Sequence, residues 1–441
     1  MKRLRYSADT LIVLATVLAN ASTIESWKKT EDAAVAAIKT AHFSEAEKLL
    51  LSNKKSAESF PPKDARLPRT LFDLAQLYRA EGRYPEALAL YERALQIYTT
   101  LYGPESQELA ETLNGEAELY KSVEDYGHAE PLLIKSLEMR QKLPSPDDAD
   151  IAQSKNDLGE LYTQTGAYDK AEQLLTDALA SRKKAGEESY EVAQTFQGLG
   201  LLYEKTRRAK QAEDSFRQAV SIFGKTVGGD HPDYANALES LAQFYESRRD
   251  FATAEPLLNR ALDIRKTVFG PEHHDVATSL NSLASLKRAE EKPQEAAVFY
   301  EQALAILEKV YGPDSPELAP ELNNFATLLE SGPNRAKAES LFLRAIALDE
   351  KGLGPESPEL SVDLNNLGGL YLFTKRYDEA AKAYERSIAI QVKTFGESDP
   401  GVKDTMASYA KVLHGLHRDA EAKQIEDRLG ISGNPQRVVV K

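Results

Sequence analysis

Residues 236–270 read NALESLAQFYESRRDFATAEPLLNRALDIRKTVFG and contain two amphipathic helical patterns in a row. Apolar or small side chains recur at i, i+3, i+4 and i+7, a spacing that puts them on one face of a helix. They are Leu238, Leu241, Ala242 and Tyr245 in the first pattern, and Ala254, Leu257, Leu258 and Ala261 in the second. The polar residues 247–250 separate the two patterns, and Gly270-Pro271 ends the second one. This stretch therefore predicts an antiparallel helical hairpin, and no alternation of β-branched residues predicts a strand.

The same hairpin pattern recurs along the chain with a period of 42 residues. A glycine marks the end of successive units at Gly186, Gly228, Gly270, Gly312, Gly354 and Gly396. A tyrosine position contains Tyr78, Tyr120, Tyr162, Tyr203, Tyr245, Lys287, Leu329, Tyr371 and Leu413. An alanine position contains Ala87, Ala129, Ala171, Ala212, Ala254, Ala296, Ala338, Ala380 and Ala422. Three positions that keep one period identify a repeat protein.

A further position in the middle of each first helix always carries a small residue. It contains Ala75, Ala117, Gly159, Gly200, Ala242, Ala284, Ala326, Gly368 and Ala410. Two helices approach to about 8–10 Å only where the contact positions carry little bulk. One hairpin cannot bury both of its faces, so successive hairpins must stack on one another. The expected fold is therefore an all-α solenoid of stacked antiparallel helix pairs.

The repeat resembles the kinesin-light-chain type of tetratricopeptide repeat (TPR). The likeness rests on LNNLGGLY at residues 364–371, on GPESPEL at 354–360, and on the small, tyrosine and alanine positions. It implies a right-handed superhelical α-solenoid, with nine units over residues 64–430. Residues 22–63 match in part and are predicted to form a degenerate capping helix pair, whereas residues 431–441 are predicted to be a flexible tail.

The composition excludes several kinds of chemistry. The 441-residue chain has no cysteine, which rules out disulfides, thiolate zinc sites and cysteine nucleophiles. Its net charge of −14 argues against nucleic acid as a partner, because phosphate contacts need clustered lysine and arginine. No phosphate-binding loop, zinc-protease motif, nucleophile elbow or dinucleotide fingerprint occurs. We therefore predict no catalytic residue, no metal site and no cofactor, and we interpret His273-His274 and the His414/His417 pair as surface histidines.

The residue that follows the early leucine of each first helix is usually an amide. This amide position contains Asn114, Asn156, Gln197, Asn281, Asn323 and Asn365, and it is interrupted by Glu239 and by the apolar Phe72 and Ala407. The TPR resemblance implies that these residues face a concave groove, where a carboxamide can bond the backbone of an extended peptide. Glu160 and Glu204 lie one or two turns further on and give the predicted groove an acidic bias.

The first 21 residues have the pattern of a secretory signal peptide. MKRLR supplies a basic head, residues 11–19 (LIVLATVLA) form a short apolar run, and Ala19-Asn20-Ala21 offers a cleavage site. The run is too short for a transmembrane helix, which needs about 20 apolar residues, so no stable membrane span is expected after cleavage. We expect export to the periplasm or the medium. The alternative is a leader helix that stays on a cytoplasmic protein.

These patterns predict a non-enzymatic scaffold that binds a partner protein or an extended, neutral-to-basic peptide in the TPR groove. Two alternatives stay open. One is a self-assembling structural or adaptor solenoid, since oligomerisation is compatible with stacked hairpins. The other is a hydrolase with an unrecognised carboxylate site.

Overall fold

The computed structural model describes residues 24–38, 43–61 and 63–430, and every regular element within these ranges is a helix. The predicted signal peptide and the predicted tail lie outside the described residues. The chain divides into two compact units, unit 1 up to Gly229 and unit 2 from Asp230 onward. Each unit is a series of helical hairpins, so the predicted all-α stack of antiparallel helix pairs is confirmed.

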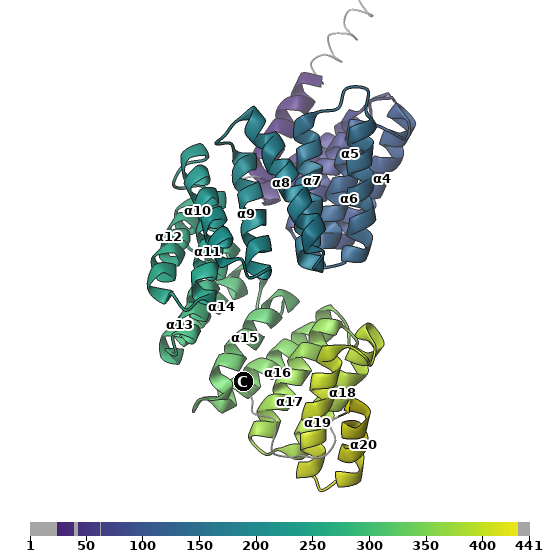
Figure 1. Ribbon diagram of the computed structural model, residues 1–441. Helices are drawn as coiled ribbons and strands as arrows, with labels where there is room; N and C mark the ends of the chain where they lie inside the picture. The colour runs from purple at the N-terminus through teal and green to yellow at the C-terminus, as the bar shows by residue number, and fades with distance from the viewer. Residues whose placement is uncertain (1–23, 39–42, 62, 431–441) are drawn as a thin grey trace, which may run out of the picture. The chain divides into compact units, whose positions relative to one another are not determined.

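Unit 1 begins with helical residues 24–38, in the segment predicted as a capping pair. The helices that follow are α2 (Phe43–Ala57), α3 (Arg66–Ala80), α4 (Tyr84–Tyr102), α5 (Gln107–Ser122), α6 (Tyr126–Lys142), α7 (Asp148–Thr165), α8 (Tyr168–Ala185), α9 (Tyr190–Lys205) and α10 (Ala209–Thr226). From α2 to α10 each helix packs against the next one along the chain (Figure 1).

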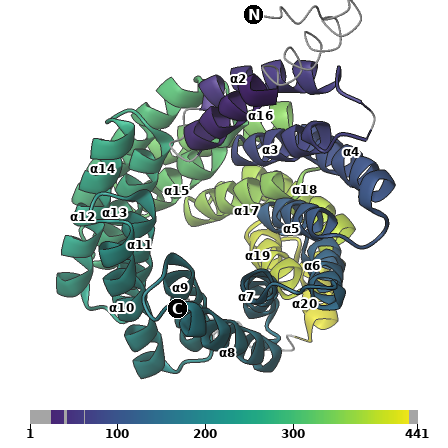
Figure 2. The ribbon, with the colours of Figure 1, turned by 90° about the horizontal axis from the view of Figure 1, so that it is seen from above.

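Unit 2 repeats this arrangement. Its helices are α11 (Pro232–Ser247), α12 (Phe251–Phe269), α13 (His274–Ala289), α14 (Pro293–Tyr311), the 3-10 turn η1 (Pro316–Leu318), α15 (Ala319–Glu330), α16 (Arg335–Gly352), α17 (Pro358–Phe373), α18 (Tyr377–Phe395), α19 (Pro400–Gly415) and α20 (Asp419–Leu429). First helices of neighbouring hairpins also touch one another, as α11 does with α13 and α15 with α17. The same holds in unit 1 for α3 with α5 and α7 with α9, and Figure 2 shows α5, α7 and α9 on one side of α6, α8 and α10. We call this shared side the first-helix face of each unit.

The hairpin predicted over residues 236–270 is confirmed as α11 and α12. The turn is one residue shorter than expected, because Ser247 still belongs to the first helix. Gly270 ends the second helix with a φ of 83°, a left-handed conformation that glycine adopts without steric cost. Inside the hairpin, however, Arg249 has a φ of 60° although it is not glycine. Its neighbour Asp250 donates its N–H to the carbonyl oxygen of Tyr245 at 2.9 Å, which closes the end of α11.

The small position has the packing role that the sequence predicts. A Cβ atom added to Gly200 of α9 would lie 2.6 Å from two ring atoms of Phe216 on α10. A Cβ atom on Gly159 of α7 would lie 2.7 Å from Cγ of Leu175 on α8. Both distances are too short for carbon atoms in contact. The small residues therefore make room for a large side chain on the second helix of the same hairpin.

The tyrosine position has a function that the pattern alone did not reveal. Tyr162 of α7 donates its hydroxyl to Glu130 of α6 at 2.8 Å, and Tyr371 of α17 donates to Glu339 of α16 at 2.9 Å. Arg376 extends this contact, since its guanidinium lies 4.3 Å from the Tyr371 ring centre and bonds Glu339 at 2.7 Å. Each such cluster joins a first helix to the second helix of the preceding hairpin.

Lysine can replace the tyrosine in these clusters. Lys287 occupies the tyrosine position of α13 and bonds Glu255 of α12 at 2.6 Å. Tyrosine or lysine at this position therefore both packs and donates a hydrogen bond to the preceding hairpin, whereas Leu329 and Leu413 can only pack.

Candidate functional site

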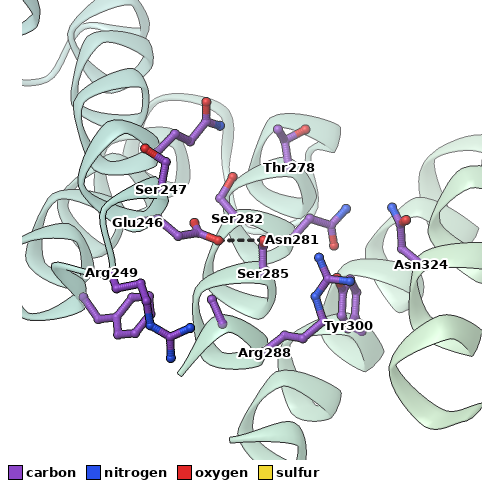
Figure 3. Close-up of a pocket in the computed structure, with 13 residues that line it drawn as sticks. Glu246, Ser247, Arg249, Thr278, Asn281, Ser282, Ser285, Arg288, Tyr300 and Asn324 are labelled. Carbon is purple, nitrogen blue, oxygen red and sulfur yellow. Dashed lines mark hydrogen bonds between the residues drawn. The ribbon is translucent and has the colours of Figure 1, made fainter. Parts of the chain in front are cut away.

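A recess of unit 2 lies on its first-helix face and has a volume of about 620 Å³. It is formed by the C-terminal half of α11, by α13, by the turn residue Arg249, and by single residues of α12, α14 and α15 (Figure 3). The lining residues are Gln243, Glu246, Ser247, Arg249, Phe251, Thr278, Asn281, Ser282, Ser285, Arg288, Ala289, Tyr300 and Asn324. We call this recess the unit 2 pocket. Its residues come from three consecutive hairpins, so the stacking of hairpins creates it.

The walls of the unit 2 pocket are polar and mixed in charge. Ser285 donates its hydroxyl to Glu246 at 2.9 Å, and burial raises the pKa of the Glu246 carboxyl above its ordinary value. Arg288 is exposed, and its side chain lies beside Tyr300 (Figure 3). Tyr300 is only 4% exposed, and burial raises the pKa of its hydroxyl. The pocket thus presents an accessible guanidinium next to a largely buried phenol.

Asn281 is the member of the amide position that lines this pocket. Its Nδ2 donates to Glu321 of α15, while its Oδ1 has no hydrogen-bond partner. Asn324 is exposed, and its amide projects toward Asn281 in Figure 3. Burial raises the pKa of Glu321 to about 8, so this carboxyl keeps its proton at neutral pH. The carbonyl oxygen of Asn281 is thus a buried acceptor without a partner in the wall of the recess.

The other amides of the predicted groove are distributed over both units. Asn114 of α5 donates to Asp157 at 2.6 Å, and Asn323 of α15 accepts from Asn366 at 3.1 Å. Asn156 of α7 is 2% exposed and is bonded at both ends, by donation to Glu160 at 2.8 Å and by acceptance from Arg182 at 3.3 Å. Gln197 on α9 and Asn365 on α17 are half-buried. Asn156 therefore stabilises the packing of its own unit, whereas Asn114 and Asn281 each keep an unpaired carbonyl oxygen.

The two predicted groove carboxylates both lie in unit 1. Glu160 of α7 faces Lys121 of α5 at 3.6 Å. Loss of hydration, together with the nearby Asp157 and Glu118 carboxylates, raises the pKa of Glu160 to about 7 in spite of this lysine. Glu204 is half-buried on α9. The structure thus groups Glu160 with other charged residues and does not place either glutamate in the unit 2 pocket.

A set of three buried arginines was missed by the sequence analysis. Arg140, Arg182 and Arg265 lie at one position of the second helices and are 4%, 5% and 5% exposed. Each donates to a hydroxyl of the next first helix, namely to Ser154 at 2.7 Å, Thr195 at 2.6 Å and Ser279 at 2.6 Å. The available signal was the recurrence of arginine followed 13 or 14 residues later by serine or threonine. We call these residues the buried arginine set.

Histidine and carboxylate groups come together at two places in the described residues. His273, His274 and Asp275 offer ligand atoms within 4.8 Å of one another, but His273 uses Nδ1 to cap α13 by accepting from the N–H of Asp275. His414 bonds Asp419 at 2.7 Å and Glu426 at 3.1 Å, and these hydrogen bonds raise its pKa. Its two ring nitrogens therefore join α19 to α20.

Two carboxylates of α7 are engaged in internal contacts. Asp157 is 6% exposed and accepts from Asn114 at 2.6 Å and from Gln153 at 2.7 Å. Glu160 accepts from Asn156. These contacts suit a structural polar cluster more than a general base.

In the part of the chain that the structure describes, no helix combines the length and apolar character needed to cross a bilayer.

The chain matches a known repeat family over most of its length. The Tetratricopeptide repeat profile matches in eight overlapping segments, at residues 66–142, 117–184, 150–225, 191–267, 233–309, 275–351, 322–391 and 361–428. Among curated proteins, none matches the chain.

Several solved structures of repeat proteins are similar to it. BtubC (BKLC) from P. vanneervenii is 24% identical over 52% of this chain and 92% of its own, with a TM-score of 0.44. A putative kinesin light chain with nearly identical TPR-like repeats from Podosopora anserina is 23% identical over 47% of this chain and 99% of its own, with a TM-score of 0.41. A Rap protein complexed with competence and sporulation factor is 14% identical over 83% of this chain and 98% of its own, with a TM-score of 0.47.

Proposed function

Because the chain belongs to the tetratricopeptide repeat family, we propose that it is a protein-interaction scaffold that binds an extended peptide segment of a partner in the unit 2 pocket. The family fold supports a protein-interaction role without enzymatic activity. The observation that carries the finer proposal is the recess itself, in which side chains of three hairpins leave hydrogen-bonding atoms available on the first-helix face.

The pocket offers both halves of the hydrogen bonding that a peptide backbone requires. The unpaired Oδ1 of Asn281 can accept from a peptide N–H, and the exposed Arg288 can donate to a peptide carbonyl. Asn324 can do either. Apolar area from Tyr300 and Phe251 supplies contact for side chains of the ligand. Such a site would bind mainly the backbone of the ligand and would contact only a small part of its side chains.

The charge of the lining residues favours a neutral peptide. Arg249 pairs with Glu291, which does not line the pocket, at 3.7 Å, so Arg288 and Glu246 remain as one cation and one carboxyl among the lining residues. The expectation of a neutral-to-basic ligand came from carboxylates of the whole predicted groove, among them Glu160 and Glu204 of unit 1. A neutral ligand satisfies both considerations, and it is the ligand that we propose for unit 2.

The test is selection of binders from a display library of neutral peptides against the full chain, followed by affinity measurement on variants. Asn281→Ala and Arg288→Ala should each weaken the selected peptides about tenfold, which is the loss of one good hydrogen bond. Lys309→Ala removes an exposed cation of α14 outside the pocket and is the matched control. Peptides that bind all three variants with the affinity of the parent chain would refute this site.

Two further parts of the proposal concern the setting of the protein. Residues 1–21 are proposed to direct export, which mass spectrometry tests by showing whether the mature chain begins at Ser22.

The alternative to peptide binding is self-assembly, in which hairpins of one copy of the chain stack on those of another. Light scattering at increasing concentration should show a monomer, and a concentration-dependent rise in mass would favour self-assembly instead.

A further inference from the structure

Residues 24–38 form the helix with which the described part of unit 1 begins, and we call it the N-terminal helix. Its Ala34 packs in one apolar cluster with Leu50 of α2 and Leu74 of α3. The same helix buries one acidic side chain, Glu31, which is only 6% exposed. A buried acid must either have a partner for its charge or keep its proton. The partners of Glu31 therefore determine what holds this helix on α3.

Three side chains contact the carboxyl of Glu31. Asn53 of α2 donates to it at 2.6 Å, and the hydroxyl of Thr70 of α3 donates to it at 3.1 Å. Asp73 of α3, which is 3% exposed, forms a hydrogen bond with Glu31 as well. Two carboxyl groups can form such a bond only when one of them carries a proton, because two carboxylates are both acceptors. The contact between the N-terminal helix and α3 thus requires a proton.

The nearest cation does not neutralise Glu31. Arg69 of α3 lies 3.1 Å from Asp73 and 3.2 Å from Glu111 of α5, so two carboxylates already share its charge. In the described part of the chain, Glu31 itself forms no ion pair with a lysine, arginine or histidine. If both Glu31 and Asp73 were ionised, the contact would bury two carboxylates against one guanidinium that Glu111 also uses.

The other groups around this pair do not change its charge near neutral pH. From α2, the neutral amide of Asn53 faces Glu31. From α4, the phenol of Tyr98 lies close enough to interact with Arg69, and burial raises its pKa, so it stays neutral. The remaining charged residues of the N-terminal helix are exposed, namely Glu25, Lys28, Lys29 and Asp32. Glu31 and Asp73 are therefore the pair whose protonation state controls this contact.

The contact favours the protonated state of the pair. Burial, together with the Asp73 carboxylate, raises the pKa of Glu31 to about 8, and burial also raises the pKa of Asp73. Solvent-exposed glutamate and aspartate have pKa values of about 4.3 and about 3.9. When the helix leaves α3 at neutral pH, the pair therefore loses a proton to the solvent. Docking of the helix must then weaken as pH rises, because the docked state binds more protons than the released state.

We propose that the N-terminal helix stays docked on α3 only while Glu31 and Asp73 share a proton, and that mildly alkaline pH releases it. Release would uncover Thr70 and Asp73, which are 0% and 3% exposed in the docked state. The start of unit 1 is thus a pH-sensitive element, whose released form offers a new surface of α3. The proposal goes beyond peptide binding in the unit 2 pocket and does not depend on it.

Trp27 provides a specific signal for docking, since it is the single tryptophan and donates its indole N–H to Thr70 at 3.2 Å. Acrylamide quenching of its fluorescence is measured on the full chain from about pH 5 to about pH 9, with circular dichroism to show that the other helices stay folded. In the parent chain the docking equilibrium should fall by up to about tenfold per pH unit until about pH 8, so quenching should increase with pH.

Glu31→Gln replaces the titrating carboxyl by a neutral amide that can still donate to Asp73, so its quenching should stay low at every pH. Glu25→Gln is the matched control, because it removes an exposed carboxyl of the same helix and should follow the parent chain. Asp73→Asn is a second variant that also removes one of the two buried carboxyls, and its quenching should rise less than that of the parent.

Trypsin cleavage at one pH gives an independent measurement. Lys28 and Lys29 lie within the N-terminal helix, and cleavage there follows the population of the released form. At about pH 8.5, Glu31→Gln should be cut at these lysines at least about tenfold more slowly than the parent and Glu25→Gln. Equal quenching of the parent at low and high pH, or a rise of the same size in Glu31→Gln, would overturn the proposal. Strong quenching of both Glu31→Gln and Asp73→Asn already at the lowest pH would overturn it too, because neutral groups would then fail to hold the helix.

Discussion

Arg265 illustrates how single buried charges hold neighbouring hairpins together. Its guanidinium bonds Ser279 of α13, Asn236 at 2.7 Å and the Glu239 carboxylate at 2.6 Å. Glu239 is itself only 7% exposed. A buried ion pair contributes little net stability compared with apolar packing, but loss of one partner leaves the other charge buried and unpaired. The energetic importance of Arg265 therefore appears only when it is removed.

Arg265→Met should destabilise unit 2 by about 3–5 kcal/mol, because Glu239 would lose its cation. Urea denaturation followed by far-UV circular dichroism measures the change. Lys309→Met is the control, since that lysine is 62% exposed and its pair with Glu272 is worth at most about 1 kcal/mol. Equal effects of the two substitutions would show that the Arg265 network is unimportant.

Asp349 and Asp363 are two buried carboxylates on successive helices, α16 and α17. Burial and the second carboxylate raise the pKa of Asp363 to about 7, and burial raises that of Asp349 to about 6. The pKa of an unfolded aspartate is about 3.9. Between about pH 4 and pH 7 the folded chain therefore keeps protons on these two carboxyls that the unfolded chain has lost. The unfolding free energy should therefore fall as pH rises from about 4 to about 7.

Asp363→Asn should flatten this pH dependence and stabilise unit 2 by roughly 1–4 kcal/mol at about pH 8, with a much smaller gain at about pH 5. Urea midpoints at the two pH values provide the measurement. The control Asp314→Asn changes a carboxylate that is 83% exposed and should alter neither midpoint. A gain of the same size at both pH values would contradict the raised pKa.

The limits of sequence analysis are clearest for the polar residues. Spacing predicted that Asn156 and Asn281 occupy one repeat position, and the position alone could not separate them. Arg182 reaches Asn156 because α8 carries an arginine there, whereas Asn281 has Glu321 as its neighbour. Arg182 lies on the second helix of the same hairpin, 26 residues away in the chain, whereas Glu321 lies on the first helix of the next hairpin, 40 residues away. A repeat pattern therefore predicts where a side chain lies but not what it bonds.

Close packing within each hairpin depends on a few small residues, and Gly200 shows this for α9 and α10. Gly200→Ala should destabilise unit 1 by about 1–3 kcal/mol, because the new methyl group would overlap the Phe216 ring. Gly369→Ala is the matched control, since its Cβ would meet only the Tyr384 hydroxyl at 3.7 Å. That variant should be stabilised by up to about 1 kcal/mol through helix propensity. Thermal denaturation of both variants checks the opposite signs.

The helices themselves were largely predictable, and the turns within hairpins were not. The 3.6-residue periodicity and the Gly-Pro stops indicate α11 and α12 nearly to the residue. The left-handed turn residues Glu124, Arg207, Arg249 and Lys375 carry no glycine or asparagine signal. The N–H groups that follow Arg207 and Lys375 bond the carbonyls of Tyr203 and Tyr371 at 2.8 Å. A backbone hydrogen bond that closes the end of the first helix thus accompanies a conformation that local propensity disfavours, and it also forms where lysine or leucine replaces the tyrosine, as at Lys287 and Leu413.

The division into two units predicts that the chain does not unfold in a single step. In stacked repeats each hairpin contacts only its neighbours, so stability is a sum of local terms. The single tryptophan, Trp27, lies in unit 1 and donates its indole N–H to Thr70 at 3.2 Å. Its fluorescence therefore reports on unit 1, whereas circular dichroism reports on all helices.

Arg265→Met should shift the dichroism curve to lower urea but leave the Trp27 fluorescence midpoint within error of the parent chain. Gly200→Ala, which lies in unit 1, is the complementary variant and is expected to shift the dichroism curve as well. If the two probes give coincident transitions and Arg265→Met moves both equally, the chain unfolds cooperatively as one unit and this prediction is wrong.

The buried arginine set has a consequence for how such a chain can change over generations. Where α12 packs on α13, Arg265 bonds Ser279. Where α16 packs on α17, Asp349 occupies the position of the arginine and lies near Asp363. A recombination event that transposed one hairpin would preserve the 42-residue period and yet pair side chains that do not match. The contacts between neighbouring hairpins thus restrict the order in which the hairpins can follow one another. Insertion or loss of a repeat is tolerated only where the side chains of the two newly joined hairpins match.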